Sequence, residues 1–250
     1  RLEQAVLLAA QMSCPTIELR GGALPMEGWT LRQDQYAGFA RALADDDEAA
    51  LQAIPRKQRA EIRKAMTSGL LVTVGRGEQD RRAHYAVYAE SVRNLGTPVF
   101  PRSLFDAVLD RFGEDADILT VWQGATPVAS VLSLYHDQMV MPYWGGGTHQ
   151  ARQLRANEWM YFSLMSHARQ RNMMRFDFGR SKMGTGAYAY KKNWGFAPVP
   201  LQYAVHQAHG SAPRDINPLN PKYRARIAMW QRLPLAVANR LGPMIARGLG

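Results

Sequence analysis

The chain has 250 residues, of which 46% are hydrophobic and 21% are charged, and this composition excludes a disordered protein. A lone cysteine, Cys14, excludes an internal disulfide framework and indicates a reducing compartment, and no apolar run is long enough to cross a bilayer. More than half of the formal net charge of +10 lies in residues 213–250, where seven basic residues and one acidic residue give +6, so an anionic partner is expected there.

Segments with a helical period of apolar residues are followed by segments with the two-residue period of a strand in the first part of the chain. Gly21 and Gly22 end one strand pattern, and Pro55 is typical of the start of a helix. The expected elements are a helix over Leu2–Met12, a strand over Thr16–Leu19, a helix or strand over Gln35–Leu43, a basic helix over Arg56–Met66 and a short buried strand over Leu70–Val74.

The second part of the chain predicts an antiparallel meander between helices. Three strand patterns follow one another with polar pairs between them, and a long amphipathic helix comes next. This order indicates an α/β (α+β) fold with mainly antiparallel mixed sheets. The expected elements are helices over Arg82–Leu95 and Ser103–Phe112, strands over Asp117–Trp122, Pro127–Tyr135 and Gln138–Trp144, the long helix over Arg152–Arg171, and strands over Met174–Phe178 and Val199–His206.

Residues 5–21 and 162–179 share a plan of helix, strand and glycine. This plan predicts an internal repeat whose first copy lacks its beginning. We also expect the chain to begin inside a longer protein, because residues 1–13 already show a helical pattern and there is no initiator Met.

The run Tyr143-Trp-Gly-Gly-Gly-Thr148 stands between the third meander strand and the long helix. A glycine-rich turn from strand to helix presents free backbone N–H groups and suits a phosphate, a pyrophosphate or a carboxylate. The alternative is that the glycines only form a tight turn. The run is not a P-loop, because no Lys-Ser/Thr pair follows the glycines.

The segment 174–195 brings charged residues to the end of a strand pattern. Asp177 either pairs with Arg175 or Arg180 or serves as a base with a raised pKa. Lys191 is either solvated or directed into a pocket, because aromatic residues surround it. These aromatic residues are Tyr188, Tyr190, Trp194 and Phe196.

Two other chemistries are disfavoured by the residue spacing. Ser181 lies in a G-x-S-x-x-G string that is one residue too long for a nucleophile elbow, which argues against a serine hydrolase. The histidines are scattered, and His206 and His209 form the one close pair without a nearby carboxylate cluster, so we expect no metal site.

Two basic segments leave alternatives open. The helix over Arg56–Met66 is either a solvated face or a binding face for a phosphate-rich ligand. Arginines and large apolar residues interleave over residues 226–245, which is typical of a helix on an anionic membrane surface. The alternative for that segment is docking on the protein's own body.

The chain resembles the FemAB family of GNAT-like acyltransferases, which includes the BioF2-like acetyltransferase domain. The resemblance rests on YWGGGT at 143–148, FDFGRS at 176–181 and GTGAYAYKKNWGF at 184–196. It extends to FemAB-related proteins of exosortase/PEP-CTERM exopolysaccharide systems through the tail string WQRLPLAVANRLGP. It implies a tandem GNAT-like fold with an incomplete first copy at 1–78, a second GNAT-like domain at 79–209 and a basic tail at 210–250.

The resemblance also implies roles for particular residues. Lys191 matches the family's lysine and is expected to stabilise negative charge near the acyl donor, with Asp177 as the candidate base. The string Arg180–Gly186 has one residue more than a typical acetyl-CoA loop, which leaves the donor open between acyl-CoA and aminoacyl-tRNA. The donor is expected at Tyr143, Trp144, Gly145, Gly146, Gly147 and Thr148, and the substrate at Arg180, Tyr188, Tyr190 and Trp194.

The resemblance thus implies an N-acyltransferase that modifies an amine on a sugar, peptidoglycan or exopolysaccharide precursor. We expect a cytoplasmic protein without a tightly bound cofactor, whose partners are the acyl donor, a sugar or lipid-linked glycan, a tRNA, and an anionic membrane at residues 213–250. The alternative is a non-catalytic GNAT-like binding module in an exopolysaccharide assembly system.

Overall fold

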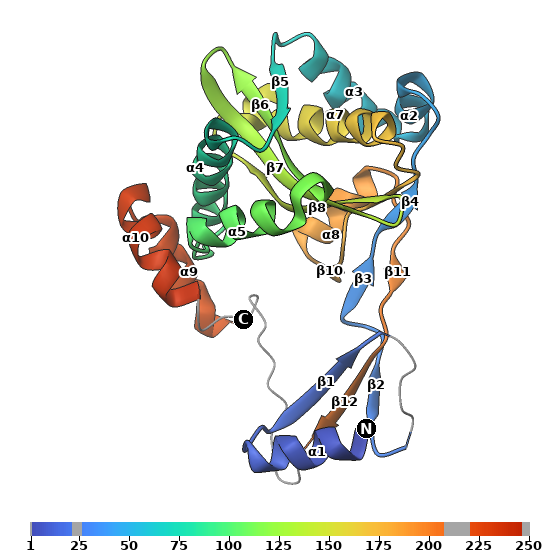
Figure 1. Ribbon diagram of the computed structural model, residues 1–250, viewed down its shortest axis with the longest axis vertical. Coiled ribbons are helices and arrows are strands. Elements are labelled where there is room, and N and C mark those ends of the chain that lie inside the picture. The colour runs from blue at the N-terminus through green and yellow to red at the C-terminus, as the bar shows by residue number, and fades with distance from the viewer. Residues whose placement is uncertain (1, 22–26, 208–220, 247–250) are drawn as a thin grey trace.

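The computed structural model describes residues 2–21, 27–207 and 221–246, and its centre is a six-stranded mixed sheet (Figure 1). The strands lie in the order β4-β9-β8-β7-β6-β5, and every neighbouring pair is antiparallel except β8 and β9. This mixed α/β architecture confirms the expected fold class. The strand bounds are Ala40–Ala42 (β4), Leu71–Gly75 (β5), Ala116–Gln123 (β6), Thr126–His136 (β7), Met139–Gly147 (β8) and Arg175–Asp177 (β9).

The predicted meander forms the middle of this sheet as β6, β7 and β8. Gly124 has a φ of +58° in the first turn, and Asp137 and Gln138 have φ values of +48° and +56° in the second. Two consecutive residues with positive φ produce the turn twist that joins antiparallel strands closely, and Asp tolerates this conformation. The meander was therefore predictable from its polar turn residues.

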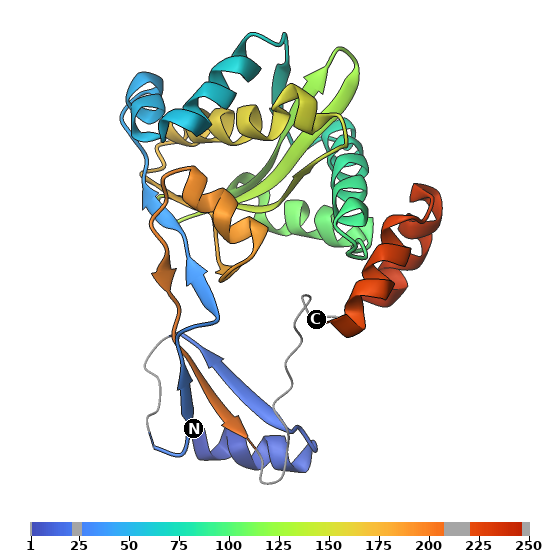
Figure 2. The same cartoon turned by 180° about the vertical axis from the view of Figure 1, so that it is seen from behind.

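Helices cover both faces of the sheet, so its central strands are buried on both sides (Figures 1 and 2). Leu119 and Val131 pack with Met160 of α7, whereas Ile118 and Leu132 pack with Phe105 of α5. The alternation follows from the two-residue period of a strand. The helices are α2 (Asp47–Ala53), α3 (Arg56–Met66) and α7 (Ala156–Gln170) on one face, and α4 (Glu78–Asn94) and α5 (Arg102–Phe112) on the other, followed by the 3₁₀ turn η1 (Gly113–Asp115).

Two expected elements differ from the structure. The strand expected to be buried at Leu70–Val74 is β5, in which Leu71 is 62% exposed and Val74 40% exposed, because β5 lies at the edge of the sheet. The single helix expected over 152–171 is two helices, α6 (Ala151–Leu154) and α7, because Arg155 adopts a left-handed conformation with φ of +56°. A left-handed residue interrupts helical hydrogen bonding and changes the direction of the chain.

A narrower part of the molecule extends from the main sheet and joins residues from both ends of the chain (Figure 1). Its two small sheets have the orders β1-β12-β2 and β10-β3-β11, with helix α1 beside β1. The strand expected over 199–206 is thus split between β11 and β12. The bounds are Leu2–Gln11 (α1), Thr16–Arg20 (β1), Thr30–Arg32 (β2), Tyr36–Gly38 (β3), Ser181–Lys182 (β10), Gly186–Asn193 (α8), Val199–Pro200 (β11) and Tyr203–Gln207 (β12).

The sheet pairings cross the domain boundary expected at residue 78. Strand β4 pairs with β9, and β5 pairs with β6, so residues 40–75 belong to the same sheet as the second half of the chain. The division at 78/79 remains a prediction about the origin of the repeat, while the main sheet is one structural unit.

Two helices of the basic tail, α9 (Pro221–Gln231) and α10 (Leu235–Ala246), pack beside α4 (Figure 2). The buried face of α10 consists of small residues, and a Cβ on Gly242 would stand 2.9 Å from the backbone nitrogen of Val99. The inner face of α10 therefore docks on the protein's own body, which is one of the two alternatives for residues 226–245. Residues 210–220 of the expected basic tail lie outside the described residues.

No helix within the described ranges is long and apolar enough to cross a membrane.

Candidate active site

The parallel neighbours β8 and β9 pair over two residues and then separate. Their register is Met139 with Arg175 and Val140 with Phe176, and no later pair joins them. A cleft of about 540 Å³ opens beyond this point, beside the middle of β8 and at the carboxyl end of β9. Its walls are Met141, Pro142, Tyr143 and Gly145 from β8, Tyr161 from α7, Asp177 at the end of β9, residues 178–180 after it, and Lys191 from α8.

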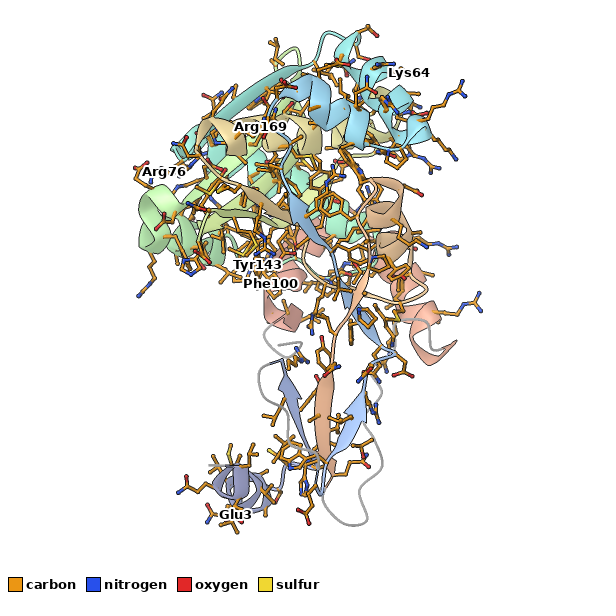
Figure 3. The ribbon with its side chains drawn as sticks, turned by 90° about the vertical axis from the view of Figure 1, so that its right-hand side faces the viewer. Glu3, Lys64, Arg76, Phe100, Tyr143 and Arg169 are labelled. Atoms are coloured by element: carbon orange, nitrogen blue, oxygen red, sulfur yellow. The ribbon has the colours of Figure 1, made fainter. Side chains whose placement is uncertain are left out.

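A β-bulge turns Tyr143 towards this cleft and Trp144 away from it. Leu132 of β7 pairs with Trp144 and Ser133 pairs with Pro142, which leaves Tyr143 without an opposite residue. Tyr143, labelled in Figure 3, is 61% exposed and lines the cleft, whereas the Trp144 ring lies edge-on to Phe105 with centroids 5.4 Å apart. Bulges commonly redirect side chains next to functional sites. Trp144 thus packs on the α5 side of the sheet rather than in the cleft.

The three glycines belong to strand β8 and not to the turn expected from the sequence. Gly145, Gly146 and Gly147 pair in register with Val131, Ser130 and Ala129 of β7. A run of glycines is typical of a turn, whereas this run forms the end of a strand that lies beside helices. A Cβ on Gly145 would stand 3.0 Å from Val131 Cγ2 and 3.2 Å from the Tyr161 hydroxyl oxygen. These glycines keep the strand close to its neighbours and leave space at its edge.

A second cavity of about 530 Å³ lies around the glycine end of β8 and shares Gly145 and Tyr161 with the cleft. The backbone N–H groups after the glycines are already engaged: that of Thr148 donates to Val128 O at 2.9 Å, and that of His149 donates to Glu90 Oε1 at 2.8 Å. They are therefore not the free donors that the sequence pattern indicated. The further walls of the cavity come from the end of α4 and from residues 149–157, with Tyr190.

The Lys191 side chain holds the loop that follows β9. Its Nζ donates to the carbonyl oxygens of Phe178 at 2.6 Å, Gly179 at 3.2 Å and Arg180 at 3.1 Å. Burial lowers the pKa of Lys191 to about 8, and the nearby Asp177 carboxylate acts in the opposite direction. Lys191 therefore places a positive charge in the cleft wall while it fixes the backbone of 178–180.

Asp177 lines the cleft but does not form the ion pair with Arg175 or Arg180 that was one of its two predicted roles. Its Oδ1 accepts the backbone N–H of Gly179 at 2.7 Å, and among the described residues it has no salt bridge with Arg175 or Arg180. Arg180 instead donates from Nη1 to the Tyr203 hydroxyl at 2.9 Å and lies over the Tyr36 ring. The carboxylate is held in a short turn because Gly179 adopts a φ of +69°.

The structure separates the other aromatic residues expected around the substrate. Trp194 is fully buried and packs edge-on to Phe178, and Tyr188 lies edge-on to Phe39. Tyr190 lines the second cavity with its hydroxyl group unpaired within the described part of the chain. Of the expected set, Tyr143, Gly145, Asp177, Arg180 and Lys191 meet at the cleft.

Tyr161 is a wall residue that sequence reasoning missed. It lies on α7 between the two cavities, and burial raises the pKa of its phenol to about 12. The available signal was a tyrosine on the apolar face of an amphipathic helix, which is more often a core residue.

Solved structures with a similar arrangement were found at low sequence identity. FemX superposes with a TM-score of 0.62 at 13% identity, over 80% of this chain and 67% of that chain. A tandem GNAT protein from the clavulanic acid biosynthesis pathway gives 0.51 at 12% identity, over 84% and 69%. L-PGS from Bacillus licheniformis gives 0.50 at 12% identity, over 92% and 69%. At these identities the likeness concerns the fold, and the chain spans about two thirds of each relative.

No curated protein matched the sequence. The family model described as "Acetyltransferase (GNAT) domain" matches residues 52–192, which is more than half of the chain. The matched region contains the main sheet from β5 to β9, both cavities and Lys191. The resemblance to GNAT-like proteins inferred from the motifs is thereby confirmed, while the link to exosortase/PEP-CTERM systems stays a prediction. The chain belongs to the acetyltransferase (GNAT) domain family.

Proposed function

We propose that this protein is an N-acyltransferase that moves an acyl or aminoacyl group from an activated donor to an amine on a sugar, peptidoglycan or exopolysaccharide precursor. The observation that carries the proposal is the cleft between β8 and β9, which places an open strand edge beside Asp177 and Lys191. A carbonyl group in this cleft lies within reach of a base, a positive charge and backbone hydrogen-bonding groups.

The donor is an acyl-CoA or an aminoacyl-tRNA, bound along the free edge of β8. Alternate N–H and C=O groups of an antiparallel strand point away from its partner, and beyond Val140 the described residues provide no partner on the β9 side. A Cβ at position 145 would crowd Tyr161, and because Gly145 has none, the space beside this edge stays open. An extended donor arm fits this edge and reaches the second cavity past Gly145, where the basic Arg152 suits a phosphate group.

The reaction is an acyl substitution at the donor carbonyl. The amine nitrogen attacks the carbonyl carbon, its proton passes to Asp177 directly or through a water, and the bond to the donor sulfur or oxygen then breaks. An amide forms, and the donor leaves as a thiol or as a tRNA hydroxyl. The charge of Lys191 and the β8 edge stabilise the negative charge on the tetrahedral carbonyl oxygen.

The acceptor is placed at the inner face of the cytoplasmic membrane by helix α10. Its inner face carries small buried residues, whereas Val237, Leu241 and Met244 are exposed beside Arg240. Exposed apolar side chains next to a cation suit an anionic lipid surface. A cytoplasmic enzyme held at that surface meets lipid-linked glycans.

A non-catalytic GNAT-like binding module is the second candidate. The specific observation in its favour is that three backbone carbonyls already accept hydrogen bonds from Lys191 Nζ, as they would around a purely structural lysine. The two candidates differ in what Lys191→Ala does. An enzyme loses rate by about 10²–10³-fold when a charge-stabilising group is removed, whereas a module has no rate to lose.

The test is a thermal-shift screen of the intact protein with acetyl-CoA, longer acyl-CoAs and aminoacyl-tRNA, followed by an amide-forming assay with each donor that binds. Lys192→Ala is the matched control, because Lys192 neighbours Lys191 on α8 but lies over the Tyr188 ring. The enzyme proposal expects transfer that Lys191→Ala abolishes and Lys192→Ala retains. Stabilisation by no donor would favour the module.

A further inference from the structure

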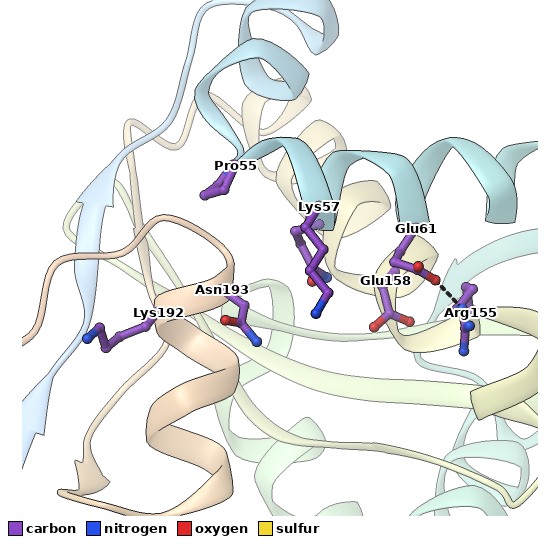
Figure 4. Close-up of a pocket in the computed structure, with 8 residues that line it drawn as sticks. Pro55, Lys57, Glu61, Arg155, Glu158, Lys192 and Asn193 are labelled. Atoms are coloured by element: carbon purple, nitrogen blue, oxygen red, sulfur yellow. Dashed lines mark ion pairs between the residues drawn. The ribbon is translucent and has the colours of Figure 1, made fainter.

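A third cavity, of about 380 Å³, lies between α3, α7 and the end of α8 (Figure 4). None of the residues that line it lines the cleft or the second cavity. Its walls carry charged and amide side chains, which include both hydrogen-bond donors and hydrogen-bond acceptors. They are Pro55, Lys57, Gln58, Glu61, Arg155, Glu158, Lys192 and Asn193.

Glu158 contributes a carboxylate that is largely buried yet has no ion-pair partner among the described residues. The Arg155 guanidinium, whose charge acts on Glu158, is engaged by Glu61 on α3 (Figure 4). Burial raises the pKa of Glu158, as expected for a carboxylate whose charge is poorly compensated. A carboxylate without an ion-pair partner in a cavity wall is a receptor for a cation or an N–H donor.

Hydrogen-bond donors face the same cavity from α3 and α8. Gln58 is 7% exposed, and its side chain favours the charged form of the Glu158 carboxylate, whereas its Nε2 makes no hydrogen bond of good geometry within the described part of the chain. Figure 4 shows the Lys57 ammonium and the Asn193 amide pointing into the space beside Glu158. Lys192 points away from this space, towards the Tyr188 ring.

Lys57 and Glu158 border the same cavity without forming a salt bridge to each other. A buried amide without a partner normally costs stability, and such groups in native proteins call for an explanation. A ligand that carries both charges would satisfy all of these groups at once, with its cation at Glu158 and its anion at Lys57, Gln58 and Asn193.

We infer that this cavity binds a small zwitterion with a primary ammonium group and a carboxylate, of the kind found in a free α-amino acid. The ammonium donates to Glu158, and the carboxylate accepts from Lys57 and from the amides of Gln58 and Asn193. The site is separate from the proposed acyl-transfer cleft and does not depend on that function.

The test is isothermal titration of the intact protein with the standard L-amino acids, one at a time. The inference expects saturable binding of at least one of them, with a Kd of about 1 mM or tighter. The N-acetylated form of that amino acid lacks the ammonium, and its amide lacks the carboxylate. Each analogue should bind about tenfold more weakly or not at all.

Two substitutions separate this site from general surface effects. Glu158→Gln removes the charge that receives the ammonium, and Lys57→Gln removes the charge that receives the carboxylate; each should weaken binding about tenfold. Lys64→Gln on the outer side of α3 is the matched control and should leave binding unchanged (Figure 3). Glu158→Gln keeps the side-chain shape, and a thermal melt confirms folding.

The inference is overturned by any of three results. They are the absence of saturable binding of every amino acid up to about 10 mM, equal binding of the N-acetylated or amidated analogue, and undiminished binding by folded Glu158→Gln and Lys57→Gln proteins.

Discussion

Lys191 combines a structural contact with a charge whose presence depends on pH. Its ammonium binds three carbonyl groups of the loop after β9, and burial lowers its pKa from 10.5 to about 8. The positive charge is therefore present below about pH 8 and is lost as the pH rises through that value. An unperturbed lysine would keep its charge up to about pH 10.

The transfer rate is accordingly expected to fall as the pH rises through about 8, because the charge that stabilises the carbonyl oxygen disappears. The measurement is the pH profile of kcat for the native protein and for Lys191→Arg. The guanidinium keeps its charge throughout this range, so the variant should lose the descending limb. Identical limbs in both proteins would show that another group titrates.

The ionisation of Glu158 is expected to lower the stability of the folded protein as the pH rises. Its pKa is raised by burial, so above that pKa the folded protein holds an ionised carboxylate in an unfavourable place. Glu158→Gln should therefore raise the unfolding temperature at pH 8. The gain should disappear as the pH falls through the raised pKa, because Glu158 then becomes neutral as well.

Thermal melts of the Glu158→Gln and native proteins between pH 4 and pH 8, a range that spans ordinary and raised carboxyl pKa values, measure this difference. Glu27→Gln, at an exposed carboxylate, is the control for the substitution itself. A difference for Glu158→Gln that stays constant with pH would contradict the assigned cause.

At the scale of elements, the proposed donor site depends on the end of β8. A methyl group on Gly145 would crowd Val131 and the Tyr161 hydroxyl at the point that both cavities share, whereas one on Gly186 would meet nothing within 4 Å. Gly145→Ala should therefore weaken donor binding about tenfold or more, and Gly186→Ala should leave it unchanged. Titration of both variants with the donor that stabilises the native protein measures the effect, and equal affinities would place the donor elsewhere.

The same strand shows which parts of the site could be predicted. The meander and the helix Arg56–Met66 follow from local turn residues and periodicity, which act within a few positions. The bulge at Tyr143 and the separation of β8 from β9 depend on pairing between distant segments, which periodicity does not report. Trp144 was therefore expected in the site, although it packs against Phe105 on the other face.

The exposure of β5 and the position of Tyr161 in the cleft wall also depend on how distant segments pair and pack. An apolar run such as Leu71–Gly75 reads as buried, whereas its place at the sheet edge is a property of the whole topology. Asp177, Lys191 and Gly145 line one cleft. Their roles there stay predictions of the motif resemblance, which periodicity does not supply.

At the scale of the whole molecule, α10 is expected to attach the protein to membranes. Its exposed apolar residues face away from α4, so changing them leaves the packed face intact. The double variant Leu241→Ser, Met244→Ser should lose most of its flotation with vesicles that contain anionic lipid. Ala236→Ser, at another exposed position on α10, is the control. Equal flotation of the double variant and the native protein would end the membrane proposal.

The central claim is that the cleft between β8 and β9 transfers an acyl group to an amine. The most direct measurement is mass spectrometry of a bacterial cell extract incubated with the intact protein and an isotope-labelled acyl-CoA or aminoacyl-tRNA. The account predicts a labelled amide on an amine-bearing glycan precursor, formed by the native and Lys192→Ala proteins and lost with Lys191→Ala. No labelled amide from any donor, or equal labelling by Lys191→Ala, would contradict it.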